Sequence, residues 1–131
     1  MSQKAFMFIG EYDAQPVAEC WLQEMNIAEP LAQYPGLDLR RIDLGIGEKD
    51  LWGQGMGTRI IALLPRLAFE VEEADMVFGL GIRDDNERSL RAFAKNGYAQ
   101  AAKRAREPNA KSRYEIDMVI DRAVWRQSQR P

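Results

Sequence analysis

The chain has 131 residues, of which 46% are hydrophobic and 29% charged, with a formal net charge of -2. This length supports one domain with a hydrophobic core, and the mixed charges are typical of a folded domain rather than a disordered chain. The small negative charge disfavours nucleic acid as a partner, and the single cysteine and the absence of histidine exclude an internal disulfide, Ser-His or Cys-His pairs and the usual zinc sites.

The apolar segments are short, and none approaches the roughly 18 residues of a membrane helix. The first ten residues also lack the pattern of a signal peptide. We therefore expect a cytoplasmic protein without a membrane partner. Cys20 stands in a strand-like run, which favours a small buried hydrophobic residue over a nucleophile.

The first half of the chain predicts three strands. Residues 4–10 and 16–25 are expected to pair as a hairpin around the polar turn 11–15, and residues 26–38 to form a loop because they contain two prolines and a glycine. Residues 39–46 alternate between apolar and other side chains. This alternation places Ile42, Leu44 and Ile46 on one face of a strand and Leu39, Arg41, Asp43 and Gly45 on the other.

The second half predicts two helices and three strands. A helix over 56–73, kinked at Pro65, is followed by a strand over 75–82 that is covered on both faces. A helix over 86–96 ends at Asn96-Gly97, a typical left-handed stop. Strands over 98–106 and 112–121 follow, and the polar tail 122–131 is expected to fray.

These elements together predict a single α+β domain over residues 1–131, built on a mixed, mostly antiparallel sheet. The strand, helix and strand over residues 39–82 form a crossover unit, so its two strands are expected to be parallel and adjacent.

Three glycines, Gly53, Gly55 and Gly57, lie between the third strand and the first predicted helix. Such a turn exposes backbone N–H groups at the positive end of a helix, which favours an anion such as a phosphate. A P-loop is excluded because no lysine follows Gly57, and the glycine spacing does not match the dinucleotide-binding fingerprint. The remaining alternative is a tight connection without a ligand.

Two motifs in order, "DLGIGEKDLWGQGMGTRII" and "DDNERSLRAFAKNGY", resemble the GNAT superfamily of N-acetyltransferases, in particular its aminoglycoside 6′-N-acetyltransferase-like branch. The resemblance covers residues 4–121 and implies acetyl-CoA as the cofactor. It implies that the amides of residues 53–58 hold the pyrophosphate, that the strand with Gly45 separates from its neighbour to pair with the pantetheine arm, and that Asn86 bonds the same arm. The implied cofactor-binding set is Leu44, Gly45, Ile46, Trp52, Gly53, Gln54, Gly55, Met56, Gly57, Thr58, Asn86 and Ser89, with no metal. Trp52 departs from the Arg or Gln that is common in the superfamily.

Asp43 matches the strand aspartate that the branch uses to bind and deprotonate the acceptor amine. The alternative, an ion pair with Arg40, Arg41 or a neighbouring strand, remains open. The tyrosine that usually protonates the leaving thiolate is replaced by Phe93, and Tyr98 is expected in the core.

The resemblance implies an N-acetyltransferase acting on a primary amine of a small cationic, aminoglycoside-like acceptor. A protein amine and a hydroxylamine remain alternatives as acceptors. A non-catalytic acyl-CoA-binding module is the alternative function, favoured by Phe93. The superfamily normally opens with a strand and two helices that have no counterpart before residue 4, so we expect a homodimer that covers the exposed sheet edge.

Overall fold

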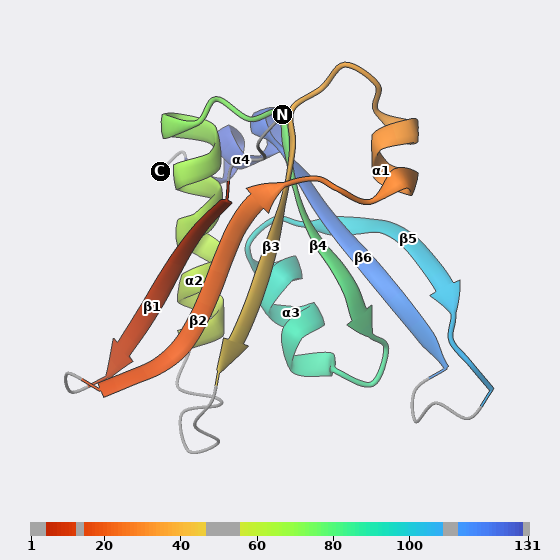
Figure 1. Ribbon diagram of the computed structural model, residues 1–131, viewed down its shortest axis with the longest axis horizontal. Helices are drawn as coiled ribbons and strands as arrows, with labels where there is room; N and C mark the ends of the chain where they lie inside the picture. Colours follow the sequence, from red (N-terminus) through yellow and green to blue (C-terminus); the bar gives the residue numbers. More distant parts are fainter. Residues whose placement is uncertain (1–4, 13–14, 47–55, 109–112, 130–131) are drawn as a thin grey trace.

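A mixed sheet with helices on both faces is the framework of the protein in the computed structural model (Figure 1). The structure describes the backbone of residues 5–12, 15–46, 56–108 and 113–129, and the side chains of residues 20–43, 58–108 and 113–129. The strands are β1 (Ala5–Tyr12), β2 (Gln15–Glu24), β3 (Leu39–Ile46), β4 (Met76–Arg83), β5 (Ala99–Ala105) and β6 (Tyr114–Asp121). The helices are α1 (Ala28–Gln33), α2 (Met56–Arg66), the π-helical turn η2 (Leu67–Val71), α3 (Glu87–Lys95) and α4 (Arg122–Ser128).

Within these ranges six strands form one sheet in the order β1-β2-β3-β4-β6-β5. All neighbours pair antiparallel except β3 and β4, which are parallel and connected through α2. The α+β class, the mostly antiparallel sheet and the parallel pair are therefore as predicted. The hairpin turn is shorter than predicted, because β1 extends to Tyr12 and β2 begins at Gln15.

The larger core fills one face of the sheet, where α2, η2, α3 and α4 supply apolar side chains. Ile42 of β3 and Val77 of β4 contribute to this core from the sheet side. A smaller cluster on the opposite face contains Met25, Leu39 and Phe78, and Tyr34 packs on Phe78 with ring centroids 6.1 Å apart. The first half of β4 is thus covered on both faces, which explains its continuous apolar sequence.

The predicted helix over 56–73 is divided into α2 and η2. Pro65 lies inside α2, where it cannot donate a backbone hydrogen bond and crowds the preceding turn. The helical turn after it widens, and Glu72 donates its N–H to the carbonyl of Leu67, five residues back, at 3.0 Å. The helix is therefore irregular just after Pro65, and a π-turn of this kind is one of the known causes of a bend in a helix.

Both ends of α3 follow the signals in the sequence. The Asn86 side chain caps the helix by accepting from the Ser89 amide at 3.2 Å. At the other end, Tyr98 donates to the carbonyl of Phe93 and Gly97 to that of Ala94, each at 3.1 Å, and Gly97 has a φ of 91°. This is the paired C-terminal arrangement that glycine favours.

Two helices were not predicted. The loop prediction for residues 26–38 was wrong over Ala28–Gln33, because Pro30 falls in the first turn of α1, where its missing N–H has no helical partner to lose. The tail prediction was wrong as well. Asp121 caps α4 by accepting from Val124 N at 2.8 Å, and Trp125 is buried against Phe69, with ring centroids 5.4 Å apart. None of the helices in the described ranges is long and apolar enough to cross a bilayer.

Candidate functional site

The parallel strands β3 and β4 pair at one end and separate at the other. Their pairing runs from Leu39 with Met76 to Ile42 with Gly79. Beyond this point β3 continues to Ile46, still paired with β2, and β4 continues to Arg83. Figure 1 shows the two strands diverging toward their carboxyl ends. No strand of the described residues pairs with the facing backbone edges in this opening, so an extended ligand that carries amide groups can pair with them.

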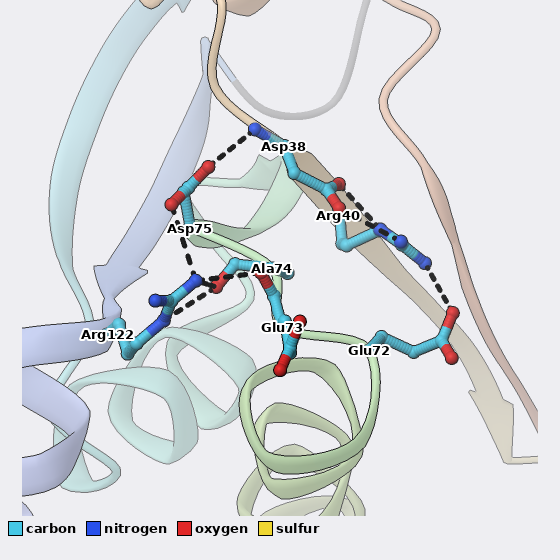
Figure 2. A network of polar contacts seen from close by, with 7 residues as sticks. All are labelled: Asp38, Arg40, Glu72, Glu73, Ala74, Asp75 and Arg122. Carbon is cyan, nitrogen blue, oxygen red and sulfur yellow. Dashed lines mark hydrogen bonds and ion pairs between the residues drawn. The ribbon is translucent and has the colours of Figure 1, made fainter.

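A polar network holds the closed end of the strand pair (Figure 2). The Asp38 amide donates to Asp75 at 2.7 Å, and Arg122 donates to the carbonyl of Ala74 at 2.6 Å. Arg122 also reaches the carbonyl of Glu73 at 2.7 Å. These bonds connect the start of β3, the segment before β4 and the first turn of α4. The closed end is therefore fixed by atoms from three separate parts of the chain.

Arg40 extends the same network beneath the start of β3. Its side chain is 2% exposed and bonds both oxygens of Asp38, at 2.8 and 3.1 Å, and Glu72 at 3.3 Å. The hydrogen bond with Asp38 raises the pKa of the guanidinium, while burial acts in the opposite direction. A buried cation that lost these partners would be costly, so Arg40 has a structural role in the closed end.

Phe93 of α3 lies where the two strands part. Gly79 is the last residue of β4 that pairs with β3, and a Cβ atom at this position would be 2.5 Å from Cζ of Phe93. The ring is buried and meets Tyr98 edge to face, with centroids 4.9 Å apart. Phe93 supplies no proton here. Tyr98 is in the core as expected, and burial raises the pKa of its hydroxyl.

Asp43 lies on β3 just past the last pair with β4, on the face opposite the larger core. Its Oδ2 accepts from Gln23 at 2.7 Å and from Arg41 Nε at 3.0 Å, and its Oδ1 accepts from Arg41 Nη2 at 2.9 Å. The ion pair that the sequence left open is thus made with Arg41. A carboxylate has about four acceptor positions, and the described residues donate to three of them, which leaves one on Oδ1 for a further donor.

The exposed Trp21 stands beside Asp43, although the sequence analysis did not select it. Trp21 of β2 is directly paired with Asp43 of β3, and its side chain is 37% exposed. Residues directly opposite each other in an antiparallel pair share a face of the sheet. Strand alternation offered a signal, because a buried Cys20 places its neighbour on the other face.

The other predicted cofactor-binding residues lie in three places. Leu44, Gly45 and Ile46 form the last part of β3, along the opening. Trp52, Gly53, Gln54 and Gly55 lie outside the described residues, so the first three residues of the predicted pyrophosphate turn 53–58 do too. Met56 and Gly57 begin α2, and Thr58 follows them in its first turn. The carbonyl of Thr58 accepts from the Asn96 side chain at 3.3 Å, which ties the start of α2 to the end of α3.

Asn86 and Ser89 lie together at the start of α3, just after the carboxyl end of β4. Asn86 is the helix cap, so its Oδ1 is engaged by the Ser89 amide. Its Nδ2 donates to no atom of the described residues, and the side chain is exposed. Asn86 can therefore cap the helix with one atom and offer the other to a ligand.

A hollow of about 730 Å³ lies between η2 and α4, lined by Phe69, Glu70, Trp125 and Arg126 among others. It is at the opposite end of the sheet from the opening between β3 and β4. Its charged rim is mixed in sign, and Arg122, which also lines it, is already bonded to backbone carbonyls. We therefore assign the candidate site to the opening and not to this hollow.

No protein-family model matches the sequence, and no curated protein matches it. The fold is similar to that of solved acetyltransferases. The aminoglycoside acetyltransferase AAC(6′)-Ib, in complex with paromomycin and acetyl-CoA, superposes with a TM-score of 0.70 at 16% identity over 96% of this chain and 70% of its own. A chimera of the spermidine N-acetyltransferase SpeG, from Vibrio cholerae and hSSAT, gives 0.73 at 13% identity over 94% of this chain and 72% of its own. RimJ of Mycobacterium smegmatis, in complex with CoA-disulfide, gives 0.72 at 17% identity over 91% and 54%. These likenesses confirm the fold that the sequence resemblance implied.

Proposed function

We propose that the protein is an acetyl-CoA-dependent N-acetyltransferase that acts on a primary amine of a small cationic acceptor. The observation that carries this proposal is the separation of the parallel strands β3 and β4 after Ile42 and Gly79. The separation occurs in a fold similar to that of acetyltransferase structures, one of which contains acetyl-CoA.

The opening suits the pantetheine arm of acetyl-CoA because that arm carries amide groups that can pair with strand edges. Bound there, the cofactor supplies an activated acetyl group as a thioester. The backbone of Leu44, Gly45 and Ile46 would hold the arm, and the free amide of Asn86 would bond it from the start of α3. The glycine turn from Gly53 to Gly57 would hold the pyrophosphate by its N–H groups and the helix dipole.

Asp43 is the group we assign to the acceptor amine. Its remaining acceptor position on Oδ1 can take an amine proton, while Arg41 and Gln23 keep the carboxylate oriented. Trp21 offers an exposed aromatic face next to it, which favours a cationic acceptor. Aminoglycosides and polyamines both have this chemistry, and AAC(6′)-Ib and the spermidine acetyltransferase chimera support the choice of these two classes.

A non-catalytic acyl-CoA-binding module is the second candidate, and Phe93 favours it. The buried ring at the branch point of β3 and β4 has no proton to give to a leaving thiolate. An enzyme with this residue must release the thiolate unassisted or protonate it from water, which the moderate pKa of a thiol allows.

The test combines calorimetric binding of CoA with thiol release from acetyl-CoA in the presence of kanamycin, spermidine and lysine. We expect CoA binding together with thiol release that depends on one of the amines. Asp43→Asn should lower turnover about 100-fold or more without weakening CoA binding, as loss of a general base does. The matched control is Glu115→Gln. Glu115 lies on β6 and its carboxylate is 3.7 Å from Nε of Arg106.

Three outcomes separate the candidates. If the protein binds CoA but no amine causes thiol release from acetyl-CoA, the non-catalytic binding module is the function that remains. Release that is equally fast in Asp43→Asn would remove Asp43 from the mechanism. No binding of CoA at all would overturn both functions.

The proposal includes the homodimer and the cytoplasmic location expected from the sequence. Sedimentation velocity at micromolar concentration tests the first, and fractionation of the producing cells tests the second.

A further inference from the structure

Asp117 lies on β6 opposite irregularities in both neighbouring strands. The pairing of β4 with β6 shifts register between Gly79 and Ile82, and that of β5 with β6 shifts between Gln100 and Ala102. Each shift places an extra residue of the neighbouring strand opposite the same part of β6. Asp117 is 3% exposed, which is unusual for a carboxylate unless it is well bonded.

The buried carboxylate connects the bulge in β4 to an arginine on β5. Its Oδ1 accepts from the Gly81 amide at 2.9 Å and from Arg104 Nη2 at 2.7 Å, and its Oδ2 accepts from Arg104 Nη1 at 2.8 Å. This hydrogen bonding raises the pKa of the Arg104 guanidinium. Arg104 is also 3.4 Å from Glu29 of α1.

Gly81 needs this carboxylate because of its conformation. Its φ of 66° lies in the left-handed region, and the register shift takes its amide out of the regular ladder with β6. An N–H group left without a partner at such a place destabilises the conformation. Asp117 therefore replaces the missing ladder bond and stabilises the bulge over a straight strand.

The bulge begins where β4 leaves β3. Gly79 is the last residue of β4 that pairs with β3, and it is also the residue at which the pairing with β6 becomes irregular. A bulge bends its strand and increases the local twist. A straight β4 would follow β3 further and narrow the opening.

We propose that Asp117, oriented by Arg104, is a positioning residue for the acyl-CoA site, because it fixes the Gly81 bulge that keeps β4 apart from β3. This inference rests on the proposed function, since it assigns the width of the opening to the pantetheine arm. Asp117 does not touch the reacting atoms. It acts through the backbone of β4.

The experiment compares three variants of the full chain. Asp117→Leu combined with Arg104→Met removes the acceptor of the Gly81 amide and replaces the ion pair with apolar side chains, a change that often preserves folding. Asp117→Asn keeps an oxygen that can accept from Gly81. Glu29→Gln is the matched control, because it removes the other carboxylate near Arg104 without touching the bulge.

Two readouts are needed, and one is independent of any ligand. Amide exchange measured by NMR reports the protection of Gly81 relative to Val77 in the paired part of β4. Calorimetry reports the Kd of desulfo-CoA and that of adenosine 3′,5′-bisphosphate, which lacks the pantetheine arm. We expect the double variant to exchange the Gly81 amide about 10-fold faster and to bind desulfo-CoA about 10-fold more weakly, with unchanged binding of the bisphosphate. Asp117→Asn should recover most of both losses, and Glu29→Gln should match the wild type.

Unchanged exchange at Gly81, or equal weakening of both ligands, would overturn the inference, because a merely structural ion pair predicts those results. If the double variant binds desulfo-CoA as tightly as the wild type does, the inference about Asp117 is overturned and the proposed function is not. A wild-type protein that binds neither ligand would overturn the proposed function, and the inference with it.

Discussion

The contact between Gly79 and Phe93 gives the sharpest test of the packing around the opening. In Gly79→Ala the new Cβ would lie 2.5, 2.6 and 3.2 Å from three atoms of the Phe93 ring, all closer than ordinary contact. The ring is buried and wedged against Tyr98, so it cannot move away freely. Overpacking of this kind costs about 1–3 kcal/mol, a large part of the roughly 5–15 kcal/mol by which such a domain is stable.

A double-mutant cycle isolates this contact. In the Phe93→Leu background the ring atoms are absent, so Gly79→Ala should cost at least about 1 kcal/mol less than it does with Phe93 present. Urea unfolding followed by circular dichroism gives each free energy. Gly36→Ala is the control, because its φ of 81° strains alanine while nothing lies within 4 Å of its Cβ, so its cost should be the same in both backgrounds. An equal cost of Gly79→Ala in the two backgrounds would refute the reasoning.

Four further predictions concern the same core. Tyr98→Phe should stabilise the protein by about 1 kcal/mol in urea unfolding, since the buried hydroxyl has no hydrogen-bond partner among the described residues, and a loss of stability would show that it has one. Because burial raises the pKa of Tyr98, its ionisation favours the unfolded chain. The contribution of Tyr98 to stability should therefore be constant below about pH 10 and fall by about 1.4 kcal/mol per pH unit above it, and Tyr98→Phe should remove this part of the pH dependence. Trp125→Ala should lower the free energy of unfolding, measured by thermal unfolding, by about 3–5 kcal/mol because the side chain is buried against Phe69. A loss below about 1 kcal/mol would show that α4 is frayed, as the sequence predicts for the tail. Gly97→Ala should lower the free energy of unfolding by about 1–2 kcal/mol, because alanine is strained at a φ of 91° and its Cβ would be 3.3 Å from Ile120. An unchanged midpoint of urea unfolding would contradict the observed end of α3.

The sequence alone was sufficient for the elements whose signals are local. Asn86 marks the start of α3 and Gly97 marks its end, because a helix cap and a left-handed stop depend only on neighbouring residues. The alternation along residues 39–46 placed Ile42 toward the core and Asp43 away from it for the same reason. Local signals failed for α1 and α4. Pro30 favours a loop by its residue type, although it stands in the first turn of α1. Trp125 is held by a contact with Phe69, far away in the chain.

The candidate site likewise has features that local sequence signals predict and features that only the tertiary structure shows. The sequence predicts that β3, the glycine turn and the start of α3 meet a cofactor, because their motifs are contiguous, and this stays a prediction. It left the ion-pair partner of Asp43 open, and the structure supplies Arg41 together with Gln23 from another strand. The resemblance implied that β3 separates from its neighbour, but only the tertiary structure shows that the separation begins after Ile42 and Gly79. It also shows that Phe93 lies on the last paired glycine and that Asp117 accepts from the bulge. These features depend on strand pairing between residues distant in the chain, and a pattern of neighbouring residues carries no record of such pairing.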